Sequence, residues 1–364
     1  MHKIGIITFF FDNFNYGALL QAYALQNILS NYVCDAEVIL IDPVDRKVSP
    51  INELCYKIRN IFLLNKFKTR KKAMRNFQLN YVKHSKYYTE SNILEANNEY
   101  TAFVTGSDIV WCNPLEYNSY IYWLLFTNDN KYRFSYAASI GQDYTILQKN
   151  VANKYIQLFD AVSVRENQAK NQINKSEREI ISVLDPTLLY EREKWNDFCS
   201  DRLYSDDYVF SFVFGDSKLS RNEIRYYAKS NNLKLITLPF MLFDINANDM
   251  FFGDIKLYNV SPQDFVSLIK HAKIIFTDSY HGVIFSLIFH KQFRVINRIA
   301  KYDTRISDLF DKFNIDQEKI RNIFNDYSVD YTSFEKLLTN YKSVSFEYIM
   351  HIKDILDENT KGSH

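Results

Sequence analysis

Short apolar runs alternate with longer segments of helical periodicity along this chain, and this rhythm restricts the fold more than any other feature. Residues 3–9 (KIGIITF) are typical of a buried strand, residues 17–31 repeat apolar positions at a spacing of three to four, and residues 36–42 (AEVILID) predict a second strand. Strands that are separated by helices pair in parallel and are covered by those helices. The sequence therefore predicts an α/β fold built on a doubly wound parallel sheet.

The same alternation occurs twice. In the first half, further strands are expected at 101–106, 132–139, 161–166 and 181–185. A second series starts near Tyr208 with a strand, a helix, a strand at 234–240, a helix opening at Ser261, a strand at 273–278 and a helix after Gly282.

The polar segment 192–207 separates the two series and shows no strand pattern. We therefore predict two Rossmann-like domains, at 1–195 and 205–330, that face each other across a cleft. By analogy with two-domain transferases, a helix at 333–357 is expected to cross back onto the first domain. Ligands in such sheets bind at the carboxyl ends of the strands, so the motifs at those ends are the candidates for function.

Length and charge narrow the function classes. A chain of 364 residues fits two domains, and 44 basic against 43 acidic residues argue against a nucleic-acid binder. The four cysteines form no CxxC pair, and no His/Cys cluster indicates a metal. With neither a secretory leader pattern nor an apolar run of membrane-spanning length, the chain is expected to be cytoplasmic.

The first motif lies at residues 12–25, where a polar loop follows the first strand and Gly17 opens a helix. Free amides at a helix N-terminus attract anions, and the side chains of Asn13 and Asn15 can hydrogen-bond a sugar or a phosphate. A tight turn before an ordinary amphipathic helix is the alternative interpretation.

The second motif, VTGSDIVW at 104–111, follows the strand that starts near residue 101. Ser107 and Asp108 are expected at the cleft, where Asp108 could accept a proton from a substrate hydroxyl or hold a sugar hydroxyl. The alternative role of both is helix capping. Trp111 is either a platform for a sugar ring or part of the core.

The third motif is SVREN at 163–167, an apolar strand that delivers Arg165 to the edge of the sheet. This placement favours recognition of a carboxylate or phosphate over a surface pair with Glu166 or a purely structural arginine. Downstream, Asp185 precedes Pro186, and we interpret it as part of a structural turn.

The fourth motif is the polar cluster TDSYHG at 277–282, set between two apolar runs. His281 stands beside Gly282 at a strand-to-helix turn, and histidine is the side chain best suited to proton transfer near neutral pH. We predict a functional role for His281, although a structural histidine is the general alternative.

Residues 57–75 carry eight basic residues and no acidic one. Such a segment is typical of a helix that contacts an anionic membrane surface or of a solvated helix face.

Six segments in this order resemble the polysaccharide pyruvyl transferase family: IGIITFFFDNFNYGALLQAYAL, FVTGSDIVW, YAASIG, AVSVREN, VLDPTLL and SPQDFVSLIKHAKIIFTDSYHGVIFSLIF. The resemblance implies a fold like that of GT-B glycosyltransferases, with two Rossmann-like domains facing a cleft. It also implies transfer of an enolpyruvate unit from phosphoenolpyruvate to two hydroxyls of a sugar, with phosphate released and no further cofactor.

The resemblance also implies residue roles. Arg165 matches the arginine of the family and would hold the donor, and His281 matches its histidine and would act as general acid. Asp108 would be the base or a hydroxyl anchor. Further donor contacts are expected from Ser279 and Gly282, and acceptor contacts from Asn13, Asn15, Gly17, Ser107 and Trp111.

One position departs from the family pattern. Some members carry an arginine two residues before the histidine, where this chain has Ser279. A replacement cation would come from Arg294, Arg298 or Arg305.

We therefore expect a pyruvyl transferase that acts on a cell-surface polysaccharide or its lipid-linked precursor, at the inner face of the membrane if residues 57–75 contact it. A GT-B glycosyltransferase with a nucleotide-sugar donor is the alternative, and a non-catalytic glycan- or membrane-binding protein is a second one.

Overall fold

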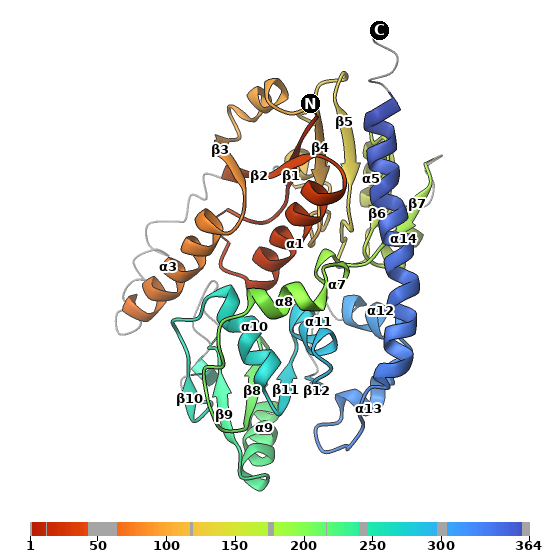
Figure 1. The fold of residues 1–364 in the computed structure, drawn as a ribbon. Helices are drawn as coiled ribbons and strands as arrows, with labels where there is room; N and C mark the ends of the chain where they lie inside the picture. Colours follow the sequence, from red (N-terminus) through yellow and green to blue (C-terminus); the bar gives the residue numbers. More distant parts are fainter. Residues whose placement is uncertain are drawn as a thin grey trace.

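The computed structural model describes residues 2–11, 13–42, 64–116, 119–173, 178–215, 217–239, 247–249, 251–296 and 304–358 (Figure 1). Two five-stranded sheets dominate these residues, and every strand pair in them is parallel. The α/β class predicted from the sequence is confirmed.

The first sheet has the order β3-β2-β1-β4-β5. Its strands are β1 (Lys3–Ile7), β2 (Asp35–Asp42), β3 (His84–Thr89), β4 (Ala102–Thr105) and β5 (Tyr132–Ser135). A short parallel pair continues beyond β5, formed by β6 (Val162–Val164) and β7 (Ile180–Ser182) and linked to the β5 region through bridges from Phe134 and Ala138. The helices of this half are α1 (Tyr16–Tyr32), α3 (Leu64–Asn80), α4 (Ser119–Tyr122), α5 (Ile146–Ile156), α6 (Asn167–Gln172) and the 3-10 helix η1 (Ile93–Asn98).

The second sheet repeats the same order with other strands, as β10-β9-β8-β11-β12. Its strands are β8 (Tyr208–Phe212), β9 (Lys234–Thr237), β10 (Ile255–Lys256), β11 (Ile274–Thr277) and β12 (Gln292–Val295). Its helices are α9 (Lys218–Ser230), α10 (Pro262–His271), α11 (Tyr280–Ile288), α12 (Thr304–Lys312), α13 (Gln317–Arg321) and the 3-10 turn η2 (Ala247–Asp249).

Both sheets are buried on both faces, as the continuous apolar strands require. Side chains alternate along a strand, so Ile6 belongs to one core and Ile7 to another. In the second sheet Ile275 and Ile274 divide in the same way. The core that holds Ile6 also holds Ile275, so a single apolar cluster packs against one face of each sheet.

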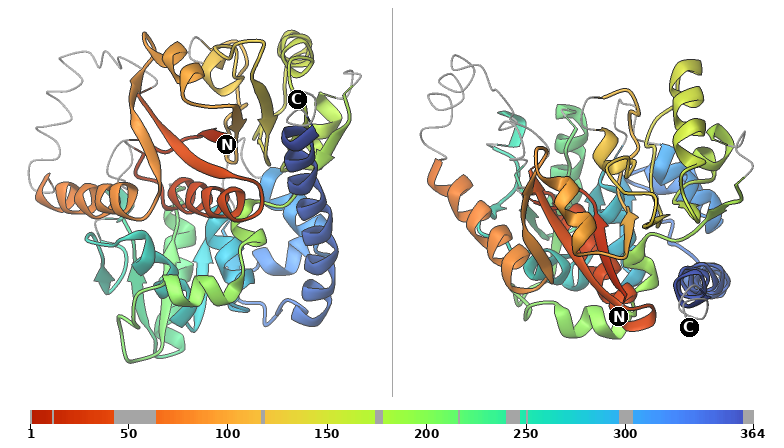
Figure 2. Two further views of the ribbon diagram at one scale, coloured as in Figure 1. Left: turned by 45° about the horizontal axis from the view of Figure 1, so that its top comes forward. Right: turned by 90° about the horizontal axis from the view of Figure 1, so that it is seen from above.

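Helices carry the chain from one half to the other (Figure 2). Helices α7 (Pro186–Leu189) and α8 (Arg192–Phe198) lead from one sheet to the other, so part of the polar segment 192–207 is helical. The last helix, α14 (Tyr331–Glu358), runs back to the first half, where the Tyr348 hydroxyl donates to the Ser135 carbonyl over 2.7 Å.

The carboxyl ends of the strands of both sheets meet at this junction. Gly17, at the start of the helix that follows β1, lies against His281, which follows β11. Arg165, directly after β6, lies under the ring of Tyr280, also after β11. The motifs singled out by the sequence are therefore brought to one place by the topology.

Candidate functional site

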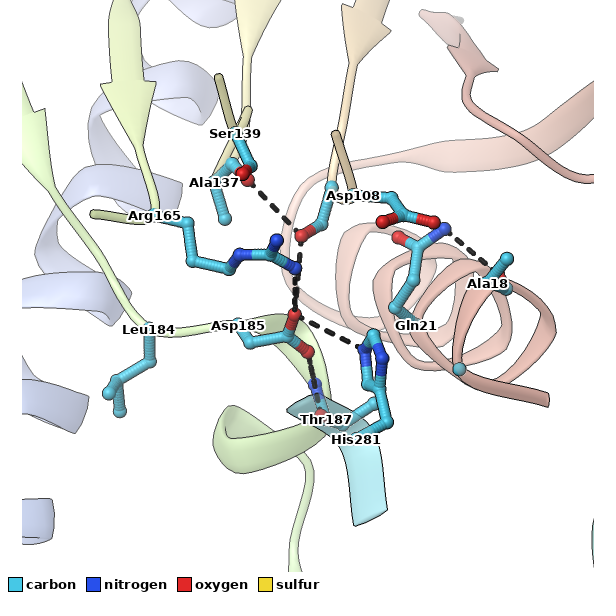
Figure 3. A network of polar contacts seen from close by, with 12 residues as sticks. Ala18, Gln21, Asp108, Ala137, Ser139, Arg165, Leu184, Asp185, Thr187 and His281 are labelled. Atoms are coloured by element: carbon cyan, nitrogen blue, oxygen red, sulfur yellow. Dashed lines mark hydrogen bonds and ion pairs between the residues drawn. The ribbon is translucent and has the colours of Figure 1, made fainter. Parts of the chain in front are cut away.

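A buried polar cluster occupies the junction, and Asp185 is at its centre (Figure 3). Asp185 Oδ2 accepts from Arg165 Nη1 at 2.9 Å and from Ser107 Oγ at 3.4 Å, and it lies 3.5 Å from His281 Nε2. Its Oδ1 accepts from the main-chain N of Thr187 at 3.0 Å and from the Thr187 hydroxyl at 2.6 Å.

Asp185 was expected to be a turn residue, and it does cap α7 as that interpretation requires. Its second oxygen, however, links three motifs that the sequence had singled out separately. Burial alone would raise the pKa of Asp185, but the charge and hydrogen bonding of His281, together with Arg165 and Thr187, hold the pKa well below its usual range. Asp185 is therefore an ionised partner of Arg165 between the two halves.

Arg165 is almost fully enclosed by its partners. Its side chain is 1% exposed, its Nε donates to Glu166 Oε1 at 2.9 Å, and its guanidinium lies 4.3 Å from the centre of the Tyr280 ring. Nη2 is buried and has no hydrogen-bond partner among the described residues. A buried N–H donor without an acceptor is costly, so Nη2 is a position where a ligand oxygen would be stabilised.

His281 is packed between the two halves. Its Nε2 faces Asp185, while a Cβ placed on Gly17 would come within 2.1 Å of Nδ1. Only glycine leaves room for the imidazole at that point of α1. Gly17 is thus required by a close approach across the junction, which the sequence motif alone did not show.

Asp108 lies on the α1 side of the cluster, next to Gln21 (Figure 3). It adopts a positive φ of 72° and accepts a hydrogen bond from the N of Ile109 at 2.9 Å. Gln21 is fully buried, and its Oε1 has no hydrogen-bond partner within the described part of the chain. Gly106, just before, has a φ of 118° and leaves no room for a Cβ against the Tyr136 carbonyl, which fixes the path of this loop.

Several predicted contacts have local structural partners. Ser279 caps α11 by accepting from the N of Gly282 at 3.3 Å, and a Cβ on Gly282 would meet Thr277. Asn15 caps α1 by accepting from the N of Gly17 at 3.0 Å, and Asn13 accepts from the N of Asn15 at 2.9 Å. The contacts of Asn13 and Asn15 are those of the alternative interpretation, a turn before a helix, and Ser279 is the N-cap of α11.

Trp111 does not present a face to a sugar. It is fully buried, stacks on Trp123 with ring centres 4.3 Å apart, and donates through Nε1 to the Tyr122 carbonyl at 3.1 Å. The expectation of acceptor binding by Trp111 is wrong for this reason, and core packing accounts for it.

Three arginines were expected to replace the cation that is absent at Ser279, and they lie in different places. Arg294 lies in β12, where it donates to the main-chain oxygens of Phe293 and Asn325, so its guanidinium ties loops together and does not reach the cluster. Arg298 lies outside the described residues. Arg305, in α12, lies 5.6 Å from the Tyr280 ring centre, and burial together with the nearby Arg165 lowers its pKa. Of the two described arginines, only Arg305 joins the cluster.

Helix α3 holds the described part of the basic segment, whose residues 57–63 lie outside the described ranges. Arg70 is buried and donates to three carbonyls of the second half, those of Pro239, Leu257 and Tyr258. Lys66, Lys68, Lys72 and Arg75 are exposed. The segment therefore has both a structural residue and a basic surface.

Within the described residues, no group of three or more His, Cys, Asp and Glu side chains is arranged to hold a metal ion. None of the described helices, α14 included, combines the length and hydropathy that crossing a membrane would need.

Comparison with known proteins gives a family match and a fold match. The profile of the family described as polysaccharide pyruvyl transferase matches residues 15–298. The curated protein sequences give no significant match.

Among solved structures, a UDP-N-acetylglucosamine 2-epimerase is similar with a TM-score of 0.56 and 13% identity, over 100% of this chain and 97% of that chain. The UDP-GlcNAc 2-epimerase of Methanocaldococcus jannaschii gives 0.48 and 13%, over 93% and 99%. The wall teichoic acid polymerase TagF gives 0.48 and 12%, over 100% and 90%. The first likeness shows the GT-B fold, and at this identity it shows the fold alone.

Proposed function

Because this chain belongs to the polysaccharide pyruvyl transferase family, we propose that it transfers a pyruvyl group from phosphoenolpyruvate to two hydroxyls of one sugar, forming a cyclic ketal. The acceptor in this proposal is a sugar of a cell-surface polysaccharide or of its lipid-linked precursor. The observation that carries the proposal is the buried Nη2 of Arg165, which has no acceptor among the described residues. The neighbouring Nη1 shares Asp185 Oδ2 with His281 Nε2, so both side chains belong to one cluster.

The charges of the cluster support this choice of binding atom. Asp108, Glu166 and Asp185 offset the guanidinium groups of Arg165 and Arg305, so net charge alone does not attract an anion. Recognition must come from directed hydrogen bonds, and the N–H at Arg165 Nη2 has no competing acceptor in the described part of the protein. A carboxylate or phosphate oxygen of phosphoenolpyruvate would fill that position with a charge-assisted hydrogen bond.

The proposed chemistry assigns one proton transfer to each half of the molecule. His281 donates a proton to C3 of phosphoenolpyruvate, which makes C2 electrophilic. A sugar hydroxyl forms a C–O bond to C2, and its proton passes to Asp108 and later restores His281. The second hydroxyl forms the other C–O bond to C2 as the bond from C2 to the phosphate oxygen breaks, and its proton leaves with inorganic phosphate.

Thermal-shift titration tests the donor. Phosphoenolpyruvate at millimolar concentration should raise the melting temperature, since a ligand that binds only the folded state stabilises it. His281→Ala should keep most of this shift and lose turnover, and Arg165→Ala should lose the shift. No shift with phosphoenolpyruvate would refute the proposal.

A panel of nucleotide sugars in the same titration tests the alternative. Ser279 stands where some family members have an arginine, so a branch with another donor is chemically reasonable, and the fold is shared with a UDP-N-acetylglucosamine 2-epimerase. A shift with a UDP-sugar and none with phosphoenolpyruvate would favour a glycosyltransferase. A shift with neither donor, together with glycan binding, would favour a non-catalytic protein.

We also propose that the exposed basic residues of α3 bring the protein to an anionic membrane that carries the lipid-linked acceptor. Lys68 and Lys72 are exposed, and no acidic residue belongs to this helix. The protein should sediment with vesicles that contain phosphatidylglycerol, and less so at high salt. Replacement of Lys66, Lys68, Lys72 and Arg75 by Gln should abolish sedimentation, and unchanged sedimentation would contradict the proposal.

A further inference from the structure

The two ring nitrogens of His281 face different halves of the protein. Nε2 lies 3.5 Å from Asp185 Oδ2 and is buried, without a hydrogen bond of normal length among the described residues. Nδ1 is the ring atom that a Cβ on Gly17 would approach most closely, at 2.1 Å, so it points at the first turn of α1. The two nitrogens therefore have distinct tasks available to them.

Asp185 can only accept at the oxygen that faces His281. Its Oδ1 is occupied by the N–H and hydroxyl of Thr187, which leaves Oδ2 to face Arg165, Ser107 and the imidazole. The carboxylate is fully buried and pairs with the guanidinium of Arg165 at 2.9 Å, which keeps it ionised. A neutral imidazole next to such a group is stabilised when the proton is on Nε2, since a lone pair there would face an anion.

We propose that Asp185 is a positioning residue that holds a proton on Nε2 of His281, so that the imidazolium gives its other proton to the substrate from Nδ1 and becomes the neutral Nε2–H ring. The role of Nδ1 rests on the proposed function, whereas the position of the ring proton does not. The reacting nitrogen then lies next to α1, on the side of the cluster where Asp108 and Gln21 also lie (Figure 3).

Asp185→Asn tests this assignment because it replaces the anion that faces the ring by an amide. Donors lie at both carboxylate oxygens, the N–H of Thr187 at Oδ1 and Arg165 Nη1 at Oδ2. Where the amide oxygen replaces Oδ1, the NH₂ group donates to Nε2 and the ring proton must be on Nδ1, a form that the carboxylate does not allow. Thr187→Val is the matched control, since it removes a hydroxyl from Oδ1 and leaves Oδ2 and the main-chain donor unchanged.

The measurement is the two-bond ¹H–¹⁵N correlation spectrum of the full chain with ¹⁵N-labelled histidine, recorded without substrate in the alkaline range where the ring signals no longer change. The His281 signals are assigned by their loss in His281→Gln. The wild-type and Thr187→Val proteins should show the Nε2–H form alone, and Asp185→Asn should populate the Nδ1–H form. An Nδ1–H ring in the wild type would overturn the proposal.

The wild-type spectrum decides the tautomer even if Asp185→Asn does not fold. Asp185→Glu keeps a carboxylate and should keep the Nε2–H form. In the pyruvyl transfer assay, Asp185→Asn should lower kcat by up to about 10³-fold, because a ring that cannot release a proton from Nδ1 loses general acid catalysis, which contributes roughly 10²–10⁴-fold. If no variant and no wild type transfers pyruvate but the spectra behave as stated, the proposed function fails and the positioning role stands.

Discussion

Two aspartates occupy corresponding places in the two sheets and have different surroundings. β4 and β11 hold the same position in the strand order, and the loops that follow them contain Asp108 and Asp278. The carboxylate of Asp278 accepts from the N of Phe214 at 2.8 Å and from the N of Gly215 at 2.7 Å, so it shapes the loop after β8. The carboxylate of Asp108 accepts from the adjacent N of Ile109.

This difference shows how the work is divided between the halves. The acidic groups around Asp185 come from the first half, namely Asp108, Glu166 and Asp185 itself. The second half supplies the imidazole of His281 and the ring of Tyr280 from the start of α11, and the guanidinium of Arg305 from α12, while its own Asp278 binds the loop after β8. The two sheets share one strand order but do not form equivalent sites, because the polar residues at their strand ends hydrogen-bond to different groups.

Replacing the imidazole should have the largest effect. His281→Gln is expected to lower kcat for pyruvyl transfer by about 10³-fold, because general acid catalysis contributes roughly 10²–10⁴-fold and no other described histidine lies in the cluster. Steady-state assays of phosphate release measure it. A variant that retains full activity would show that the second half does not supply the proton.

The pair Asp108→Asn and Asp278→Asn separates chemistry from loop structure. Asp108→Asn should lower kcat on the order of 10²-fold with a small change in stability, because the main-chain N–H of Ile109 can still donate to the amide oxygen. Asp278→Asn should cost about 1–3 kcal/mol of unfolding free energy, because an amide offers one acceptor oxygen to two main-chain donors.

Urea unfolding and the same kinetic assay distinguish the two variants. The comparison fails if Asp108→Asn is as destabilising as Asp278→Asn and fully active. If the activity of Asp278→Asn recovers at low temperature, where the folded fraction is higher, its loss of activity comes from unfolding and not from a change in the chemistry.

The strand-to-helix rhythm was enough to predict the class of fold and the edge at which the polar motifs gather. It correctly suggested that Asp108, Arg165 and His281 follow strands, since each strand ends where its apolar run ends. It did not predict that Asp185 would join them, because the residues that Asp185 links come from separate strands and from both halves. The Asp-Pro signal predicts the contact of Oδ1 with Thr187 in the turn, but it contains no information about Oδ2, which binds Arg165 and Ser107.

Burial was the harder property to predict from local sequence. Trp111 follows a polar loop, but the strand-end position does not reveal that Trp123, 12 residues further along the chain, stacks on it. Arg294 ends in main-chain hydrogen bonds for a similar reason, since the carbonyl of Asn325 that accepts from it lies in a distant loop.

Gly17→Ala tests the contact that brings the two halves together, with a smaller expected effect. The added methyl would lie 2.1 Å from Nδ1 of His281, so the ring or helix α1 must move. We expect about a tenfold loss of kcat and a cost of about 1–3 kcal/mol in unfolding free energy, as overpacking in a filled core commonly gives. Ala18→Gly, one residue further along α1, is the control for helix propensity. Wild-type kinetics in Gly17→Ala would mean that the close packing of the ring against α1 is not required for turnover.

Arg70→Met tests the hydrogen bonds that join helix α3 to the second half. Of the predicted effects on activity, this one is expected to be the smallest. Arg70 reaches from α3 to the carbonyls of Pro239, Leu257 and Tyr258, which follow the strands of the second sheet at its β9–β10 side. Methionine fills a similar volume without donors, so these carbonyls lose a cationic partner and unfolding free energy should fall by roughly 2–3 kcal/mol. Because the cluster around Asp185 has its own contacts between the halves, kcat should change by less than about threefold while the urea midpoint falls.

Lys72→Met, on the same helix but exposed, should change neither quantity. A large loss of kcat in Arg70→Met at unchanged stability would show instead that α3 sets the position of the two halves during turnover, and that the cluster depends on a contact outside it.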